Sequence, residues 1–359
     1  MLVFGVCDLI FISNFIVVAT YLTVGFFKFN SITLHVKNAA IEKKVSKFKF
    51  SKKNYNFIYI RSIILSLFFL FWQNNLYRGF YETLWNDHIF VSDFSIHISS
   101  LIIFFSLLVF FFIYNLSLSK LYFSIDFLYA TTLLFLVIIL LFISNTFITF
   151  YFILELSVCL TFFKFSVSRF WFRNPDKCYS KNSLEKFSNA LPKNHVNVLF
   201  FQYWVSFFSS VLLLFFFINL EFYFGSTEWT FLNLSMHYCD LPIDFYFYFF
   251  FFIIGFFLKV GLAPFHLYKL EVYRGLPFIT IYIYTLVFFL GYFLYFSVLL
   301  LYNLNSFFVY YWIVVFLLVF IGILYVIFLL FDVNFIKNFF AYSTVINIVL
   351  LLCIILAAF

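Results

Sequence analysis

The sequence has too few charged residues for a protein that folds in water. Only 10% of its 359 residues are charged, whereas soluble domains carry roughly 25%. Hydrophobic residues make up 65% of the chain, and the mean hydropathy is +1.07. Because so few polar side chains cannot cover a surface that faces water, the composition excludes a soluble globular protein and indicates one that lies in a lipid bilayer.

Glycine, proline and cysteine are also scarce. The chain has 9 glycines and 5 prolines but 67 phenylalanines and 26 tyrosines, a bias toward AT-rich codons that we interpret as the mark of an organelle genome. The 5 cysteines are scattered without a CxxC pair, so they predict neither a disulfide framework nor a metal or iron–sulfur site. The sequence contains no Rossmann glycine fingerprint, Walker loop or catalytic triad, so any NADH or flavin chemistry must belong to partner proteins.

Long apolar runs dominate what remains. A helix needs about 20 apolar residues to cross the hydrocarbon core, and these runs lack the alternation of barrel strands. The sequence therefore predicts an all-α polytopic membrane protein with ten transmembrane helices, near residues 9–27, 57–73, 96–116, 126–143, 146–165, 197–219, 244–265, 277–300, 308–331 and 337–357.

The distribution of charge supports this count. Lys and Arg collect in loops that are not translocated across the membrane. Ten spans put 20 of the 22 basic residues on one side, with Arg78 on the other side and Lys259 inside a span. The net charge of +7 follows from this asymmetry. The lysine-rich stretch at residues 28–53 is typical of an inside loop near anionic lipid rather than of a nucleic-acid-binding patch.

Two ionisable residues stand out inside the predicted spans. Glu155 is in the middle of the fifth span, and Lys259 follows an aromatic run in the seventh. A charge at mid-bilayer costs from about 2.5 to more than 10 kcal/mol, so such residues are functional candidates, although each could also be a structural ion pair. Burial favours the neutral forms and pairing the charged forms, so a Glu–Lys pair of variable strength can load and release a proton.

A helix break is predicted just after Lys259. Pro264 has no amide hydrogen and clashes with the preceding turn, and Gly261 and Ala263 lie beside it. Broken helices at membrane depth occur where they line a polar cavity, as in transporters, although a proline kink without a transport role is the alternative. His266 follows the break and is a candidate proton shuttle, or else a satisfied core histidine.

The residues around this break resemble a known signature. Residues 259–275 read Lys-Val-Gly-Leu-Ala-Pro-Phe-His-Leu-Tyr-Lys-Leu-Glu-Val-Tyr-Arg-Gly. They are similar to the pattern Lys-x-Gly-x-Ala-Pro-Phe-His-x-Trp-x-Pro-Glu-Val-x-x-Gly of the subunit 2 family of mitochondrial NADH:ubiquinone oxidoreductase (complex I), which is antiporter-like. Ser144-Asn145 followed by Glu155-Leu156-Ser157, and then residues 334–343, resemble its fourth, fifth and tenth helices. The similarity runs from about residue 140 to the end of the sequence.

The resemblance implies an antiporter-like bundle of inverted five-helix repeats, each with a broken helix, around a hydrophilic axis that carries protons when quinone is reduced elsewhere in the complex. On this scheme, residues 1–125 form three N-terminal transmembrane helices with a basic inside loop. Residues 126–300 form the first repeat, and residues 301–359 form the first two helices of an incomplete second repeat.

Matched position by position, the resemblance also implies roles for four residues. Glu155 takes the place of the modulating carboxylate and Lys259 that of the central protonatable lysine. His266 is implied to be a shuttle beside it, and Glu271 takes the acidic position near the inner surface. Together these four residues are the expected proton relay.

The sequence departs from the family pattern in several places. Gln202 and Phe289 align where the family often has lysines, near the start of span six and in span eight. Tyr268 replaces the usual Trp, and Leu270 replaces the usual Pro. The family's last four helices have no counterpart here, so we expect a separately encoded polypeptide or neighbouring subunits to supply them.

The implied function is proton translocation by a multi-pass subunit of NADH:ubiquinone reductase in the mitochondrial inner membrane, with its basic loops in the matrix and both termini in the intermembrane space. The expected partners are other membrane-arm subunits and lipids, with no nucleic acid. NADH, FMN, iron–sulfur clusters and ubiquinone would bind to partner subunits, and this chain is expected to bind no cofactor or metal. Two alternatives stay open: an independent cation/proton antiporter subunit, and a structural scaffold that does not conduct, which the missing lysines favour.

Overall fold

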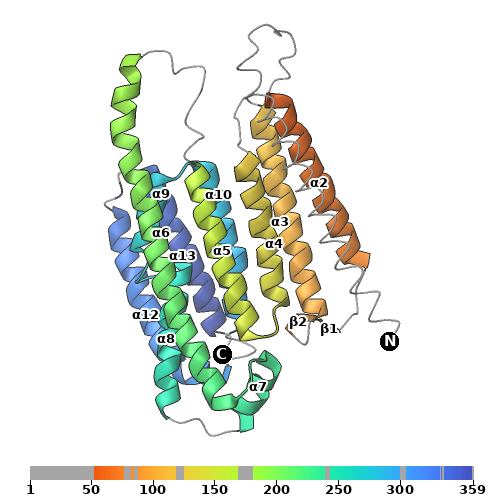
Figure 1. The fold of residues 1–359 in the computed structure, drawn as a ribbon. Coiled ribbons are helices and arrows are strands. Elements are labelled where there is room, and N and C mark those ends of the chain that lie inside the picture. Colours follow the sequence, from red (N-terminus) through yellow and green to blue (C-terminus); the bar gives the residue numbers. More distant parts are fainter. Residues whose placement is uncertain are drawn as a thin grey trace. The chain divides into compact units, whose positions relative to one another are not determined.

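The computed structural model describes residues 52–76, 82–84, 88–118, 125–168, 181–238, 243–299, 305–331, 333 and 335–357, which are almost entirely helical (Figure 1). The elements are α2 (Lys52–Leu76), β1 (Glu82–Leu84), β2 (Ile89–Val91), α3 (Asp93–Leu118), α4 (Ile125–Ile143), α5 (Phe147–Ser168), α6 (Lys181–Phe224), α7 (Trp229–Tyr238), α8 (Ile243–Val260), α9 (Leu267–Gly275), α10 (Phe278–Val287), the π-helix η3 (Phe288–Phe293), α11 (Leu294–Val298), α12 (Asn305–Phe331) and α13 (Ile336–Ala357).

The helices coincide with the predicted spans. Among the described residues, seven helices are long and apolar enough to cross a membrane, and two shorter apolar helices cover residues 60–72 and 247–260. Together they match nine of the ten predicted spans, and the predicted span at residues 9–27 lies outside the described residues. The predicted class, an all-α polytopic membrane protein, is confirmed.

The chain divides into two compact units, one formed by residues 1–84 and 91–135 and the other by residues 85–90 and 136–359. In the first unit α2 packs along α3. The rings of Phe71 and Phe104 lie 6.4 Å apart, and the Asn74 side-chain amide donates a hydrogen bond of 3.0 Å to the Ser99 hydroxyl. These compact units do not test the repeat boundaries inferred at residues 126 and 301, which stay a prediction.

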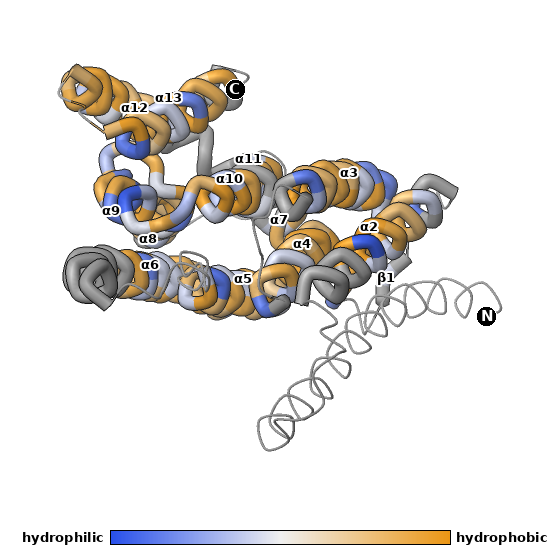
Figure 2. The backbone as a smooth tube through the Cα atoms, turned by 90° about the horizontal axis from the view of Figure 1, so that it is seen from above, coloured by the Kyte–Doolittle hydropathy of each residue, from blue (hydrophilic) through white to orange (hydrophobic). Residues whose placement is uncertain are grey.

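The helices of the second unit are arranged in three rows. Seen from above, α8, α9 and α10 lie between the α5–α6 pair and the α12–α13 pair (Figure 2). Contacts agree with this view, since α6 packs against α8 and α9, and α9 in turn packs against α13. The broken span formed by α8 and α9 is therefore the central element of this unit.

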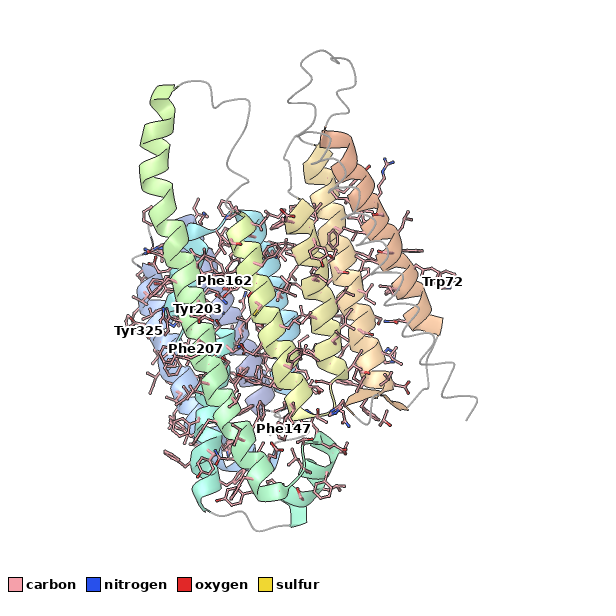
Figure 3. The ribbon with its side chains drawn as sticks, in the orientation of Figure 1. Trp72, Phe147, Phe162, Tyr203, Phe207 and Tyr325 are labelled. Atoms are coloured by element: carbon pink, nitrogen blue, oxygen red, sulfur yellow. The ribbon has the colours of Figure 1, made fainter. Side chains whose placement is uncertain are left out.

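Aromatic rings fill the core of the second unit. Phe150 of α5 stacks on Tyr295 of α11 with ring centroids 4.6 Å apart, and Phe256 of α8 packs against Phe296 at 4.7 Å. Such aromatic pairs contribute about 0.5–1.5 kcal/mol beyond the burial of their area. On the outside, Phe162, Tyr203 and Phe207 form an apolar face on α5 and α6, as lipid contact requires (Figure 3).

A short helix that the sequence analysis did not predict, α7, closes one end of this unit. The Trp229 amide donates to the Asn145 carbonyl at 3.1 Å, and the Phe147 amide donates to the Thr227 carbonyl at 3.0 Å. These bonds satisfy backbone groups at the start of α5 that have no partner within that helix. They fix the beginning of α5, and with it the position of Glu155 two turns further on.

Candidate functional site

The site is built around one ion pair between two helices. Lys259 Nζ on α8 donates a hydrogen bond of 3.2 Å to Glu155 Oε1 on α5. The lysine side chain is 2% exposed and the glutamate side chain 33% exposed. The structure therefore brings together the two residues whose meeting was expected, and their role in proton transfer stays a prediction.

Helix geometry explains why Lys259 can be placed here. It lies in the last turn of α8, where the carboxyl end of the helix carries a partial negative charge. The favourable field at a helix terminus offsets part of the cost of burying an ammonium group, and Glu155 offsets more. The break in the chain thus creates a helix end inside the bundle and a place for a cation at that end.

The break itself occurs at Gly261, three residues before the proline on which the prediction relied. Gly261 has a φ of +68°, and its amide and that of Leu262 both donate to the Phe257 carbonyl, at 2.8 and 2.9 Å. This left-handed cap ends α8, and glycine adopts it without the steric cost that a Cβ would add. Residues 261–266 then form the turn that leads into α9.

Tyr268 satisfies the carbonyl groups that the break leaves open. Its hydroxyl lies 3.0 Å from the Leu258 carbonyl and 3.5 Å from that of Lys259, and donates to them. Tyr268 stands where the family usually has Trp. The phenol supplies a hydrogen-bond donor to the last turn of α8 at the same depth as Lys259.

His266 lies in the turn, apart from the ion pair. Its side chain is fully buried, with ring centroids 5.9 Å from Tyr325 of α12 and 6.1 Å from Tyr342 of α13. The Pro264 carbonyl is near the ring, but neither ring nitrogen makes a well-formed hydrogen bond within the described part of the chain. The histidine thus faces α12 and α13, whereas Glu155 lies on α5, on the other side of the break.

Glu271 belongs to a different cluster. It accepts a hydrogen bond of 2.7 Å from Arg274 on the same helix, and Arg274 Nε donates to Asn338 Oδ1 on α13 at 3.1 Å. Lys337 of α13 donates to the Leu276 carbonyl at 2.7 Å, just beyond the end of α9. The structure places Glu271 in this contact between α9 and α13, and not with the Glu155–Lys259 pair.

A small cavity with a mixed polar and apolar lining adjoins Lys259. It has room for about one water molecule, and it is lined by Val158, Gln202, Val205, Ser206, Leu258, Lys259, Tyr268 and Tyr292. Gln202 is buried and accepts a hydrogen bond of 3.2 Å from the Tyr284 hydroxyl. Gln202, which aligns where the family often has a lysine, therefore lines the same cavity as Lys259 and offers it a neutral amide.

Phe289, the other residue that aligns where the family often has a lysine, lies in the π-helix η3. Three residues later, Tyr292 lines the cavity and forms a hydrogen bond with the Ser157 hydroxyl of α5. A π-helix inserts residues into the helical register and is often found at functional sites. Sequence reasoning missed Tyr292, because one tyrosine among many carries no signal.

Two further lysines are buried, although the charge count of the sequence analysis included both among the 20 basic residues of the loops on one side of the membrane. Lys164 of α5 is 1% exposed, and Lys269 of α9 is 2% exposed. Lys164 continues a buried polar stripe with Ser157, Thr161 and Ser168, at the spacing of one helix face. That spacing was visible in the sequence and would have predicted the burial of Lys164. Among the described residues, no group of three His, Cys, Asp or Glu side chains could hold a metal ion.

Comparisons with known proteins place this geometry in context. Residues 194–358 match the transmembrane family of NADH:quinone oxidoreductase and Mrp antiporters. The fold is antiporter-like. It is similar to a chain of respiratory complex I from Thermus thermophilus, with a TM-score of 0.58 at 14% identity over 81% of this chain and 57% of that chain. The family match confirms the predicted resemblance for residues 194–358, and the structural likeness shows an antiporter-like fold.

Two other proteins are similar to this chain. A chain of the membrane-bound sulfane sulfur reductase, an archaeal respiratory membrane complex, matches with a TM-score of 0.63 at 13% identity, over 94% of this chain and 63% of that one. The uncharacterized mitochondrial protein ORF4 of Paramecium tetraurelia is 35% identical over 89 residues, which are 23% of this chain and 56% of that protein. The chain thus spans between 56% and 63% of the length of these relatives.

Proposed function

We propose that this chain is a membrane-arm subunit of respiratory complex I that takes part in proton translocation coupled to NADH:ubiquinone electron transfer. The observation that carries the proposal is the Glu155–Lys259 pair, held at 3.2 Å beside a broken helix and a small cavity that Lys259 itself lines. A lysine that exchanges its carboxylate partner for a water in the cavity becomes easier to deprotonate, because the ion pair favours the charged form. Alternation between these two states loads and unloads one proton.

The antiporter-like fold and the mitochondrial relative support the setting that we propose. The chain would lie in the mitochondrial inner membrane with its basic loops on the matrix side. NADH, FMN, iron–sulfur clusters and ubiquinone would be held by partner subunits. Copurification of this chain with an NADH-oxidising arm tests that assignment, and a particle that lacks such an arm would favour an independent cation/proton antiporter subunit.

The face of α12 supports a proposal about partners. Only 22% of its apolar span is buried, against 60% for the span from Phe278 to Val298. The solved chains that resemble this one are longer, since this chain covers 57% and 63% of two of them, and the resemblance implies further helices after the tenth span. We therefore propose that helices from a separate polypeptide or a neighbouring subunit cover α12. Cross-linking from Leu317→Cys, at an exposed position of α12, tests this, and exclusive labelling of lipid would contradict it.

A second candidate function is a structural subunit that does not conduct. Gln202 favours this alternative, because a neutral amide stands in the cavity where the family often has a lysine. The two candidates differ in what happens when Lys259 is changed. A conducting subunit needs the amine, whereas a scaffold needs only its packing.

The deciding experiment compares proton pumping in the reconstituted complex. Lys259→Met and Glu155→Gln are expected to lower the number of protons moved per electron while NADH oxidation continues. Arg61→Met and Glu221→Gln serve as controls, since both residues are exposed and lie outside the site, on α2 and α6. An unchanged ratio in both site variants would leave the scaffold as the better description.

A further inference from the structure

The buried amine of Lys269 has no place in the signature that the sequence resembles. It stands at a variable position of that pattern, between Tyr268 and Leu270, and in the structure its side chain is 2% exposed. A lysine is almost never fully buried without a specific reason, because the ammonium loses its hydration. Lys269 therefore needs an explanation that packing alone does not give.

The side chain of Lys269 points back toward the helix break. Side chains on a helix lean toward its N-terminus, which for α9 is the turn that follows Gly261. A Cβ atom added to Gly261 would overlap the Lys269 Cε atom and lie 2.9 Å from its Cδ atom. The end of the Lys269 chain thus lies directly on the residue that ends α8, two positions after Lys259.

Lys269 is also close to His266 in the chain fold. The two residues are three positions apart at the start of α9, and the Lys269 amide donates a hydrogen bond of 2.9 Å to the His266 carbonyl. Tyr268, whose hydroxyl caps α8 and lines the cavity beside Lys259, lies between them in the sequence. Lys269 is therefore a titratable residue close both to the end of α8 and to the turn that holds His266.

We propose that Lys269 carries the proton across the helix break, between Lys259 and His266. In the forward step the Lys259 ammonium gives up one proton, and the neutral Lys269 amine takes it, directly or through a water. Lys269 then passes one proton to a ring nitrogen of His266 and returns to the neutral amine. Each step moves one proton and one positive charge and needs no other reactant.

This inference rests on the proposed function and supplies a group that the departures from the family pattern removed. Gln202 lines the cavity but cannot be protonated at physiological pH, and an amide cannot hold a transferred proton. A lysine amine titrates readily when buried, whereas an arginine in the same place stays charged. The choice between Lys and Arg at position 269 therefore separates a proton carrier from a fixed charge.

The test measures protons moved per NADH oxidised in the assembled complex reconstituted into vesicles. Lys269→Met and Lys269→Arg are each expected to lower proton movement at least tenfold while NADH oxidation persists. Lys269→His is expected to recover part of it, because an imidazole can also accept and release a proton. Arg61→Met removes an exposed cation from α2, away from the break, and it should keep the wild-type ratio.

Two results would overturn the proposal. One is a wild-type ratio in Lys269→Met. The other applies if that variant does not assemble, and it is a wild-type ratio in Lys269→Arg, which keeps the charge and the length. Lys259→Met in the same assay distinguishes the two levels of inference. If it stops pumping while the Lys269 variants pump normally, only the relay across the break fails, whereas normal pumping by all of them contradicts the proposed function itself.

Discussion

The coupling between Glu155 and Lys259 can be predicted from their geometry. Two unit charges 3.2 Å apart attract by about 1.3 kcal/mol in bulk water and by about 5 kcal/mol at an effective dielectric constant of 20. Because Glu155 keeps a third of its side chain exposed, solvent screens part of the larger value. We expect a coupling free energy of about 1–3 kcal/mol, which corresponds to a factor of about 5–150.

A double-mutant cycle of proton pumping measures this coupling. Glu155→Gln, Lys259→Met and the double variant are each reconstituted with the rest of the complex, and pumping rates are normalised to NADH oxidation. The second substitution should cost much less when the first is already present, because the pair acts as a unit. Rates that multiply independently, within about 0.3–0.5 kcal/mol of additivity, would refute the idea that the two residues work through their contact.

Three other predictions concern the break and the helix that passes over it. In Gly322→Ala the new Cβ would lie 2.5 Å from Ala263 Cβ, so we expect the free energy of unfolding to fall by about 1–3 kcal/mol. Thermal unfolding measures this loss, and adding Ala263→Gly to the same chain should reverse it. Gly261→Ala places a Cβ at a φ of +68°, which costs about 1–2 kcal/mol even without the clash at Lys269, and reduced assembly on native gels checks this. Tyr268→Phe removes the hydrogen-bond donor to the last turn of α8 and should lower the free energy of unfolding by about 1 kcal/mol. Tyr203→Phe, on the outer face of α6, should melt like the wild type. Equal melting temperatures of the two variants would argue against the cap.

The membrane spans could be predicted from the sequence because lipid tolerates little variety. Each crossing needs a long apolar run whose backbone bonds to itself, and composition alone reveals such runs. Glu155 and Lys259 were identified for the same reason, as rare ionisable residues in those runs. The break was also predicted, although Pro264 attracted attention and the structure ends the helix at Gly261.

The remaining features depend on where helices face, which span detection does not address. Lys164 and Lys269 were assigned to loops because they lie at span edges, whereas the structure buries both. The π-helix shifts the register of the segment that follows Phe288, so an alignment by position cannot show that Tyr292 lines the cavity. The short helix α7 has little apolar length, and its placement comes from backbone bonds to residues 145 and 147 that no sequence pattern reveals.

The contact of Lys337 with the end of α9 has a mechanical consequence. Two residues of α13 bind the end of α9: Lys337 donates to the Leu276 carbonyl, and Asn338 accepts from Arg274. A tilt of α13 would therefore move α9 with it. The turn of residues 261–266 would then have to bend, because it joins α9 to α8. A movement of α13 would therefore first change the conformation of this turn, which begins two residues after Lys259 of the ion pair.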